Sequence, residues 1–358
     1  MKILHVYPQL NSGGTEMVIY NILHYGQDSE FRYELLTEIP GNNEAKFKNI
    51  GIPIHHIPFS DGEAYFNRLV NFMRDGGYSA VHVHMNTHLP IVLKAAKEAG
   101  INCRIAHSHN ARLDIPVFMW NLLAPFHHRY EKYATHLVGC SRLALRWLFP
   151  FRWKHGNIIN NGIDMDAFRY NPITRESVRS NLGLSPTSKV FIHVGRCTPQ
   201  KNQKFILDLA NNRRDKDEVY LMVGEGPDLK SLKNYAKKFN LSNVRFLGLR
   251  TDIPQLLAAS DIFLFPSIYE GLGIVAIEAQ ASGLNVITSD QLPPEADLGL
   301  GNFLPIALKN IKQWEEFMDK DVLTDKEREN LSHKAFSSSY NIKTAVKELK
   351  KIYSDSTL

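Results

Sequence analysis

The 358-residue sequence has few of the features that mark secreted, membrane-spanning or zinc-cluster proteins. It has only three cysteines, Cys103, Cys140 and Cys197, and no C-x-x-C spacing. We therefore expect neither a disulfide framework nor a cysteine zinc site, and a reducing compartment fits best. Its 15 histidines show no zinc-ligand spacing, because His55-His56 and His127-His128 are adjacent pairs. No apolar stretch approaches the roughly 20 residues that a membrane-spanning helix needs.

Targeting and charge signals are also weak. The segment Met1–Pro8 is too short and too strand-like for a signal peptide, so we expect a cytoplasmic protein. Hydrophobic residues make up 44% and charged residues 22%, which is ordinary globular composition. The net charge of +5 suits a phosphate-bearing small molecule, an anionic membrane surface or nucleic acid. An ordinary solvated basic surface would also explain it.

Two nucleotide-related motifs are missing as well. Gly13-Gly14 follows the first expected strand and opens a helix, where glycine lets the backbone approach a bound anion. This pair is not the G-x-G-x-x-G dinucleotide fingerprint, and a plain tight turn is the simpler reading of it. No Asp-x-Asp pair stands at the end of an expected strand, so we expect no metal bridging a diphosphate and no cofactor.

What is present is a regular alternation of strand and helix signals. Apolar runs such as Lys2–Tyr7 alternate with helical segments, among them Pro116–Tyr133, and the pattern restarts at Lys189–Gly195. Such alternation predicts an α/β protein with parallel sheets. We expect two Rossmann-like domains, residues 1–168 and 174–335, that face a central cleft, with Asn171–Thr174 as the linker. Residues 336–358 are expected to form a helix that packs back on the first domain.

Two carboxylates eight residues apart are the strongest functional signal. Glu270 follows the buried strand Ile262–Phe265, and Glu278 lies on the helix that begins after Gly273. Ligands of open α/β sheets bind at such strand ends. Carboxylates accept hydrogen bonds from vicinal hydroxyls, and the free amides of Gly271–Ile274 can face an anion. The segment therefore predicts a ligand that carries sugar hydroxyls and phosphate.

A basic loop leaves the first strand of the second domain. In Gly195–Asn202, Arg196 and Lys201 could hold a diphosphate and stabilise the charge that develops when it leaves. A solvated basic loop is the alternative. His109, after the strand Cys103–His107, could meet a ligand from the first domain, although a histidine at such a place is more often structural.

A stretch rich in basic and aromatic residues runs from Trp120 to Lys154 and contains three of the four tryptophans. Such residues suit the headgroup level of an anionic membrane. Partly buried aromatic residues on ordinary helices would explain them equally well. No nucleic-acid-binding motif accompanies them, so we expect no nucleic-acid partner.

In order and spacing, these motifs resemble the family 4 retaining glycosyltransferases, which have the two-domain GT-B fold. The resemblance covers roughly residues 1–340, and Glu278–Gly283 is most similar to the bacterial capsular and exopolysaccharide branch. The motifs that carry the resemblance are Gly13-Gly14-x-Glu16, His109, Asn161-Gly162-Ile163-Asp164, Gly195-Arg196…Lys201-Asn202, Gly224-Glu225-Gly226-Pro227 and Glu270-Gly271-Leu272-Gly273-Ile274…Glu278-Ala279.

The resemblance implies a role for each matching residue. Arg196 and Lys201 would bind the donor diphosphate together with the amides of Gly271, Leu272, Gly273 and Ile274. Glu278 would hold the nucleotide ribose, and Glu270 would contact the donor-sugar hydroxyls. His109 would lie beside the sugar, and Gly13 and Gly14 would border the diphosphate and the acceptor.

The function expected from this resemblance is metal-independent, retaining transfer of a sugar from a nucleotide diphosphate, expected to be UDP. The acceptor would be a lipid-linked or growing saccharide, and the enzyme would be cytoplasmic with a peripheral contact on the inner membrane face. A nucleotide-sugar epimerase and a non-catalytic saccharide-binding protein are the alternatives. The sequence does not identify the donor sugar, the linkage or the oligomeric state.

Overall fold

The chain folds into two units, which a computed structural model describes over residues 1–11, 14–85, 88–109 and 131–355. The first unit comprises Met1–Ile163 and Ser339–Leu358, and the second comprises Asp164–Ser338. Asn171, expected in a linker, instead accepts hydrogen bonds at the start of the second unit's first helix, whose first residue is Pro172. Proline is well suited to that position, since it lacks only an amide that would be unpaired there.

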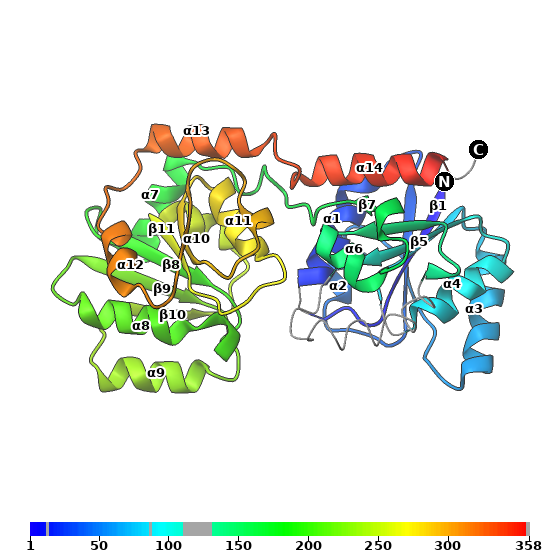
Figure 1. The fold of residues 1–358 in the computed structure, drawn as a ribbon, viewed down its shortest axis with the longest axis horizontal. Helices are drawn as coiled ribbons and strands as arrows, with labels where there is room; N and C mark the ends of the chain where they lie inside the picture. The colour runs from blue at the N-terminus through cyan, green and yellow to red at the C-terminus, as the bar shows by residue number, and fades with distance from the viewer. Residues whose placement is uncertain (12–13, 86–87, 110–130, 356–358) are drawn as a thin grey trace. The chain divides into compact units, whose positions relative to one another are not determined.

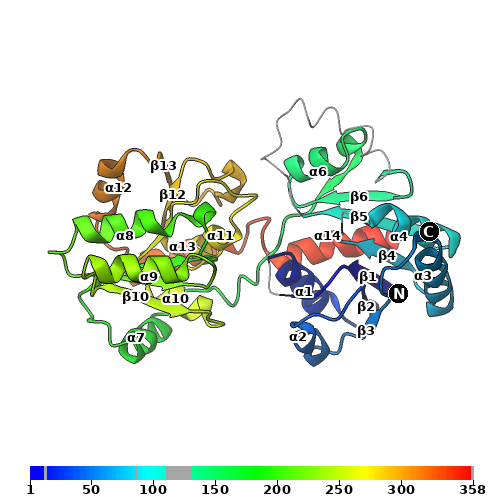
Figure 2. The same ribbon diagram turned by 90° about the horizontal axis from the view of Figure 1, so that it is seen from below.

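The first unit, which contains α1 and α14 in Figure 1, is built on a seven-stranded, entirely parallel sheet. The strand order is β3-β2-β1-β4-β5-β6-β7, and β1 to β6 are labelled in Figure 2. Its elements are β1 (Lys2–Tyr7), α1 (Gly14–Gly26), β2 (Arg32–Thr37), α2 (Glu44–Asn49), β3 (Ile54–His56), α3 (Gly62–Gly76), β4 (Ala80–Val83), α4 (Leu89–Glu98), β5 (Cys103–Ser108), β6 (His136–Gly139), α6 (Arg142–Leu148), a 3-10 turn η1 (Trp153–His155), β7 (Asn157–Ile158) and α14 (Ile342–Asp355).

The two faces of this sheet differ in chemistry. Leu4, Val81 and Ala106 point into an apolar core shared with α3, α4 and α6. The residues that alternate with these along the strands, such as His5 and His82, point to the opposite face of the sheet. There α1 and α14 pack together (Figure 2). The predicted helix Pro116–Tyr133 lies largely outside the described residues.

The second unit has a six-stranded parallel sheet with the strand order β10-β9-β8-β11-β12-β13. Its elements are α7 (Pro172–Asn181), β8 (Lys189–Val194), a 3-10 turn η2 (Pro199–Lys201), α8 (Gln203–Asn212), β9 (Glu218–Val223), α9 (Leu229–Lys238), β10 (Val244–Gly248), α10 (Ile253–Ala259), β11 (Ile262–Phe265), α11 (Ile274–Ala281), β12 (Asn285–Ser289), a 3-10 turn η3 (Pro294–Ala296), β13 (Phe303–Ile306), α12 (Ile311–Met318) and α13 (Asp325–Ala335).

The second unit's sheet is buried on both faces. One core contains Val190, Phe263 and Phe265, and the other contains Phe191 and Leu264. Neighbouring residues of one strand thus enter opposite cores, which is why β11 reads as a continuous apolar run. The fold prediction is confirmed, since each unit is a parallel sheet flanked by helices, as in a Rossmann-like domain.

Candidate active site

Three loops meet at the carboxyl edge of the second sheet, because β9, β8 and β11 are neighbours in it. The loop after β8 carries Arg196 and Lys201, the loop after β9 carries Glu225, and the loop after β11 carries Glu270. The sheet topology therefore gathers three of the predicted motifs at one edge, which is where ligands of open α/β sheets bind.

The loops after β8 and β9 are held together by their backbones. The Cys197 amide donates to the Glu225 carbonyl at 2.9 Å. Gly224 has φ +131°, and a Cβ there would lie 2.1 Å from the Gly195 carbonyl oxygen. Gly226, with φ +156°, would place a Cβ 2.4 Å from the Cys197 carbonyl oxygen. Both glycines are required because any side chain would force these two loops apart.

The loops after β8 and β11 are tied by hydrogen bonds that the sequence did not predict. The Ile268 amide donates to the Gln200 carbonyl at 2.8 Å, and the Gln200 side-chain amide donates to the Tyr269 carbonyl at 2.9 Å. Asn202 adds a bond of 3.2 Å to the Pro266 carbonyl. These links fix the segment that carries Lys201 against the segment that carries Glu270.

Lys201 and Glu270 form an ion pair at the centre of this arrangement. The distance between Lys201 Nζ and Glu270 Oε1 is 2.5 Å, and the two side chains are only 17% and 7% exposed. The ammonium group also lies 4.9 Å from the centre of the Phe265 ring. A carboxylate has about four acceptor sites, so Glu270 keeps capacity to accept hydrogen bonds from ligand hydroxyls. Arg196, on the same loop as Lys201, is exposed.

The start of α11 supplies backbone amides at the same edge. Gly273 adopts φ +78° immediately before Ile274, the first helical residue. The first amides of a helix have no acceptor within it and carry partial positive charge, which suits a phosphate. Glu278 lies one turn further along α11, and burial raises its pKa to about 8.

In the first unit, the structure describes part of the predicted site. Gly14 is the exposed first residue of α1, whereas Gly13 lies outside the described residues. His109 is only 8% exposed. Its Nε2 lies 2.7 Å from His84 Nδ1, and its Nδ1 lies 3.4 Å from Asn161 Oδ1. His109 is therefore a buried, hydrogen-bonded imidazole, and burial lowers its pKa to about 4.

Comparison with known proteins identifies the enzyme class. Residues 174–338 match the model of the "Glycosyl transferases group 1" family. The matched residues make up nearly the whole second unit. The putative glycosyltransferase EpsF of Bacillus subtilis is 29% identical over 380 residues, covering 99% of this chain and 97% of its own length. The chain is a glycosyltransferase. It resembles the branch that includes CapH of Staphylococcus aureus, a capsular polysaccharide biosynthesis glycosyltransferase that is 23% identical over the full length of both chains.

Solved structures agree with the GT-B fold of this glycosyltransferase. The Anabaena protein HepE in complex with UDP and glucose has a TM-score of 0.81 at 19% identity, covering 99% of both chains. WaaG, a glycosyltransferase involved in lipopolysaccharide biosynthesis, has a TM-score of 0.71 at 18% identity and covers 98% of this chain and 99% of its own. At this low identity the likeness establishes the fold alone.

The sequence did not predict a group of histidines in the glycosyltransferase's first unit. His109 belongs to a buried group that also contains His5, His82, His84 and His107. The signal that could have revealed it is the spacing H-x-H, which occurs at 82–84 and again at 107–109. Residues two apart in a strand point to the same face, so two such pairs on neighbouring strands bring four imidazoles together.

The basic and aromatic stretch divides into a partly buried part and an exposed part. Trp147 and Trp153 pack against the apolar core of the first unit, whereas Leu143 and Phe151 are 39% and 58% exposed. Trp120 lies outside the described residues. No helix in the described ranges is long and apolar enough to span a bilayer.

Proposed function

We propose that this glycosyltransferase moves a hexose-type sugar from a UDP-sugar to a lipid-linked or growing saccharide, with retention of the anomeric configuration. The observation that carries the proposal is the Lys201–Glu270 pair, fixed by tied loops at the carboxyl edge of the second sheet. Exopolysaccharide, capsule or another cell-surface glycan would be the product. The likeness to EpsF and CapH favours that assignment.

Two related proteins support the choice of donor and acceptor. An Escherichia coli relative, 38% identical over 239 residues, is described as a UDP-Gal:α-D-GlcNAc-diphosphoundecaprenol α-1,3-galactosyltransferase, and the match covers 62% of this chain and 60% of its own. Its name gives a UDP-sugar as donor and a lipid diphosphate saccharide as acceptor. The HepE structure likewise contains UDP.

In the proposed reaction, basic side chains and backbone amides at the start of a helix bind the diphosphate. Lys201 and Arg196 contribute positive charge, and the amides of Gly271–Ile274 add donors, so the negative charge that develops on the departing UDP is stabilised. Glu270 accepts hydrogen bonds from the transferred sugar, and Glu278 accepts from the ribose. The step is proposed to need no metal ion.

His109 is the first unit's proposed contribution, beside the donor sugar. Its Nε2 lies 2.7 Å from His84 Nδ1, and its Nδ1 makes a long 3.4 Å contact with Asn161 Oδ1. Gly13 and Gly14 are proposed to border the diphosphate and the acceptor.

Replacing Lys201 or Glu270 tests the assignment. We expect Lys201→Ala and Glu270→Gln each to lower turnover of the UDP-sugar by roughly 10²- to 10³-fold, the usual effect of losing one charge-stabilising group. Lys204→Ala is the matched control, because Lys204 forms an exposed ion pair with Asp208 on the helix that follows. Near-wild-type turnover in both site variants, with correctly folded protein, would contradict the assignment.

A donor-only incubation separates transfer from the alternatives. With a UDP-sugar and no acceptor, a transferase gives at most slow hydrolysis, whereas an epimerase gives a new nucleotide sugar. A screen of nucleotides by thermal shift identifies the donor class, since a ligand that binds the native state raises the unfolding temperature. No shift with any nucleotide diphosphate would favour a non-catalytic saccharide-binding protein.

We further propose that the enzyme is cytoplasmic and touches an anionic membrane through α6 and the segment after it. Leu143 and Phe151 are exposed there together with Arg142, Arg146 and Lys154. Exposed apolar side chains beside basic ones favour binding at an anionic lipid surface.

Vesicle binding tests this contact. Leu143→Ser with Phe151→Ser should weaken sedimentation with phosphatidylglycerol vesicles and leave the weak binding to phosphatidylcholine unchanged. Ile173→Ser with Leu249→Ser is the control, because these residues are even more exposed but belong to the second unit. Equal sedimentation of both double variants would refute a lipid contact at this surface.

A further inference from the structure

Five buried histidines lie side by side on one face of the first unit's sheet. His5 is on β1, His82 is on β4 with His84 directly after that strand, and His107 is on β5 with His109 directly after it. The three strands are neighbours in the order β1-β4-β5. None of the five residues is more than 8% exposed. The proposed sugar transfer uses only His109, so the remaining four require a separate explanation.

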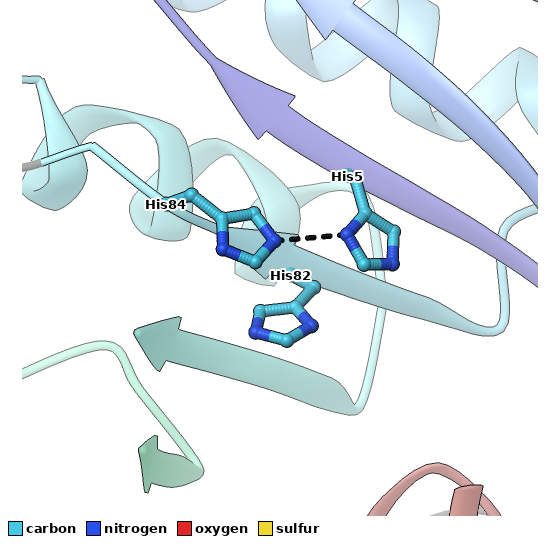
Figure 3. Close-up of side chains that lie close together, drawn as sticks. All are labelled: His5, His82 and His84. Atoms are coloured by element: carbon cyan, nitrogen blue, oxygen red, sulfur yellow. Dashed lines mark hydrogen bonds between the residues drawn. The ribbon is translucent and has the colours of Figure 1, made fainter. Parts of the chain in front are cut away.

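One part of the group is a hydrogen-bonded row that ends at Asn161. Asn161 Oδ1 lies 3.4 Å from His109 Nδ1, and His109 Nε2 lies 2.7 Å from His84 Nδ1. His84 Nε2 in turn lies 2.8 Å from His5 Nδ1, the contact drawn in Figure 3. Both ring nitrogens of His84 and of His109 are thus in contact with a partner.

The other part runs through Tyr353 of α14. The Tyr353 hydroxyl lies 3.4 Å from His5 Nε2 and 2.7 Å from His82 Nδ1, and His82 Nε2 lies 3.0 Å from His107 Nδ1. The remaining nitrogen of this part, His107 Nε2, is buried and has no hydrogen-bond partner among the described residues. A buried polar atom without a partner is costly, and a bound ion is one way to satisfy it.

We infer that His84, His107 and His109 form a binding site for a divalent transition-metal ion of the zinc class. Each of the three offers one ring nitrogen, and these three nitrogens lie within 4.8 Å of one another. The ligand atoms are His84 Nδ1, His109 Nε2 and the otherwise unpartnered His107 Nε2. Neutral imidazole is a preferred ligand of such ions, and three histidines leave a fourth position open for hydroxide or another small anion.

The hydrogen bonds around the three ligands match what a metal site needs. A metal-bound histidine donates its other N–H to an acceptor, which fixes the ring. Here His109 Nδ1 faces Asn161 Oδ1 and His84 Nε2 faces His5 Nδ1. His107 Nδ1 faces a ring nitrogen of the neighbouring strand, His82 Nε2. In each of the three histidines, the ring nitrogen that does not bind the metal therefore has a partner that can accept its hydrogen bond.

Proton positions can adjust within the group, at the cost of the hydrogen bond that the Tyr353 hydroxyl would otherwise donate to one of two histidines. When His84 carries its proton on Nε2, His5 carries its own on Nε2, facing the Tyr353 oxygen. His82 then carries its proton on Nδ1, facing the same oxygen.

The ligand nitrogens have to move apart slightly. With Zn–N bonds of about 2.0–2.1 Å in a tetrahedral site, neighbouring ligand nitrogens are separated by roughly 3.3 Å. His84 Nδ1 and His109 Nε2 are 2.7 Å apart, the distance of a hydrogen bond. The ion takes the place of the shared proton. The rings have to rotate to admit it, including those of His107 and His109, which are stacked with their centres 4.0 Å apart.

A second trio, His5, His82 and His84, also places its nitrogens within 4.8 Å and is the group shown in Figure 3. It is the weaker candidate. Both nitrogens of His82 already contact Tyr353 or His107, so a metal there would break one of these contacts. It would also leave His107 Nε2 without a partner. The trio that contains His107 satisfies every nitrogen of the group.

Metal binding is measured directly and does not depend on sugar transfer. Chelator-treated full-length protein is dialysed against Zn²⁺ or Co²⁺, and the retained metal is quantified. We expect one tightly held ion per chain, and the X-ray absorption spectrum of the wild-type Zn²⁺ protein should show three imidazole ligands. Markedly substoichiometric metal, or a spectrum without imidazole scattering, would show that the histidines are only a hydrogen-bonded row.

Variants locate the ion. His107→Gln should lower the Zn²⁺ affinity by more than about 100-fold, and Asn161→Ala, which removes an outer partner, by roughly 10- to 100-fold. His193→Gln is the control, because His193 is equally buried but belongs to the second unit. The circular dichroism spectrum and unfolding temperature of each metal-free variant check its folding. Unchanged affinity in a folded His107→Gln or Asn161→Ala protein would overturn the site.

Discussion

Glu278 shows how burial prepares one side chain for its proposed role. An acid with a pKa of about 8 is mostly protonated at neutral pH, because desolvation disfavours its charged form. Two ribose hydroxyls that donate to the carboxylate would favour the ionised form. Binding of the nucleotide and ionisation of Glu278 are therefore coupled, and each should strengthen the other.

The pH dependence of UDP affinity tests this coupling. As the pH rises from about 6 to about 8, wild-type affinity should increase by up to about tenfold per pH unit and then level off above the pKa of Glu278. Titration calorimetry on wild type and Glu278→Gln measures the effect. Ionisation of the UDP phosphate contributes equally to both proteins and cancels in the comparison. If the affinity of both proteins changed equally with pH, the ionisation of Glu278 would not be coupled to nucleotide binding.

Residue roles of this kind were only partly predictable. The positions of Glu270 and Lys201 after β11 and β8 were predicted, because polar residues that follow apolar runs mark strand ends. The contacts of Gln200 and Asn202 that bring these two together could not be read, since they depend on β8 and β11 being neighbours in the sheet although they are far apart in the chain. Propensity and pattern are local, whereas strand order is a property of the folded chain.

The first turn of α11 carries backbone amides that we propose to bind the donor diphosphate. Gly273 has φ +78°, and a Cβ there would lie 3.1 Å from a Phe265 ring atom and 3.3 Å from a Leu292 methyl. Gly271, two residues earlier, has no atom within 4 Å of the same position and no positive φ. Two glycines of one loop therefore differ in what they tolerate.

Alanine at each glycine tests that difference. We expect Gly273→Ala to lower the free energy of unfolding by about 1–2 kcal/mol, because the left-handed conformation is unfavourable for alanine and its neighbours must move. Gly271→Ala should change it by no more than about 0.5 kcal/mol. Urea denaturation of both proteins provides the comparison. Equal loss of stability would mean that the conformation of Gly273 is not required.

Strands and helices with a clear hydrophobic pattern were predicted better than strands at the edge of a sheet. The apolar run of β11 was recognised as a buried strand, as the structure confirms. β13 was not predicted, because Pro305 interrupts its pattern. Proline is tolerated there because β13 is the last strand of the sheet and needs hydrogen bonds on one side only. α14 was predicted from its length and pattern, but not its contact with the histidines.

At the scale of the whole molecule, the chain enters the second unit after Ile163 and returns to the first at Ser339. The return is tight at one point, since a Cβ on Gly162 would lie 2.6 Å from the Cα of Ile342, at the start of α14. The last residues of the sequence thus complete the unit that the first residues begin. The stability of the first unit should therefore depend on α14, which is far from the rest of that unit in the sequence.

Tyr353 tests that dependence, because its side chain, on α14, is fully buried and contacts His82 and His5. Tyr353→Ala should destabilise the first unit by about 3–5 kcal/mol, the usual cost of removing a large buried ring. Tyr353→Phe keeps the ring and should cost only about 1–3 kcal/mol, the penalty for leaving a buried partner unpaired.

Hydrogen exchange resolved by peptide should show faster exchange in β1, β4 and α14 of the alanine variant. Protection of β8 and β11, in the second unit, should stay as in wild type, and uniform loss across both units would show that they unfold as one.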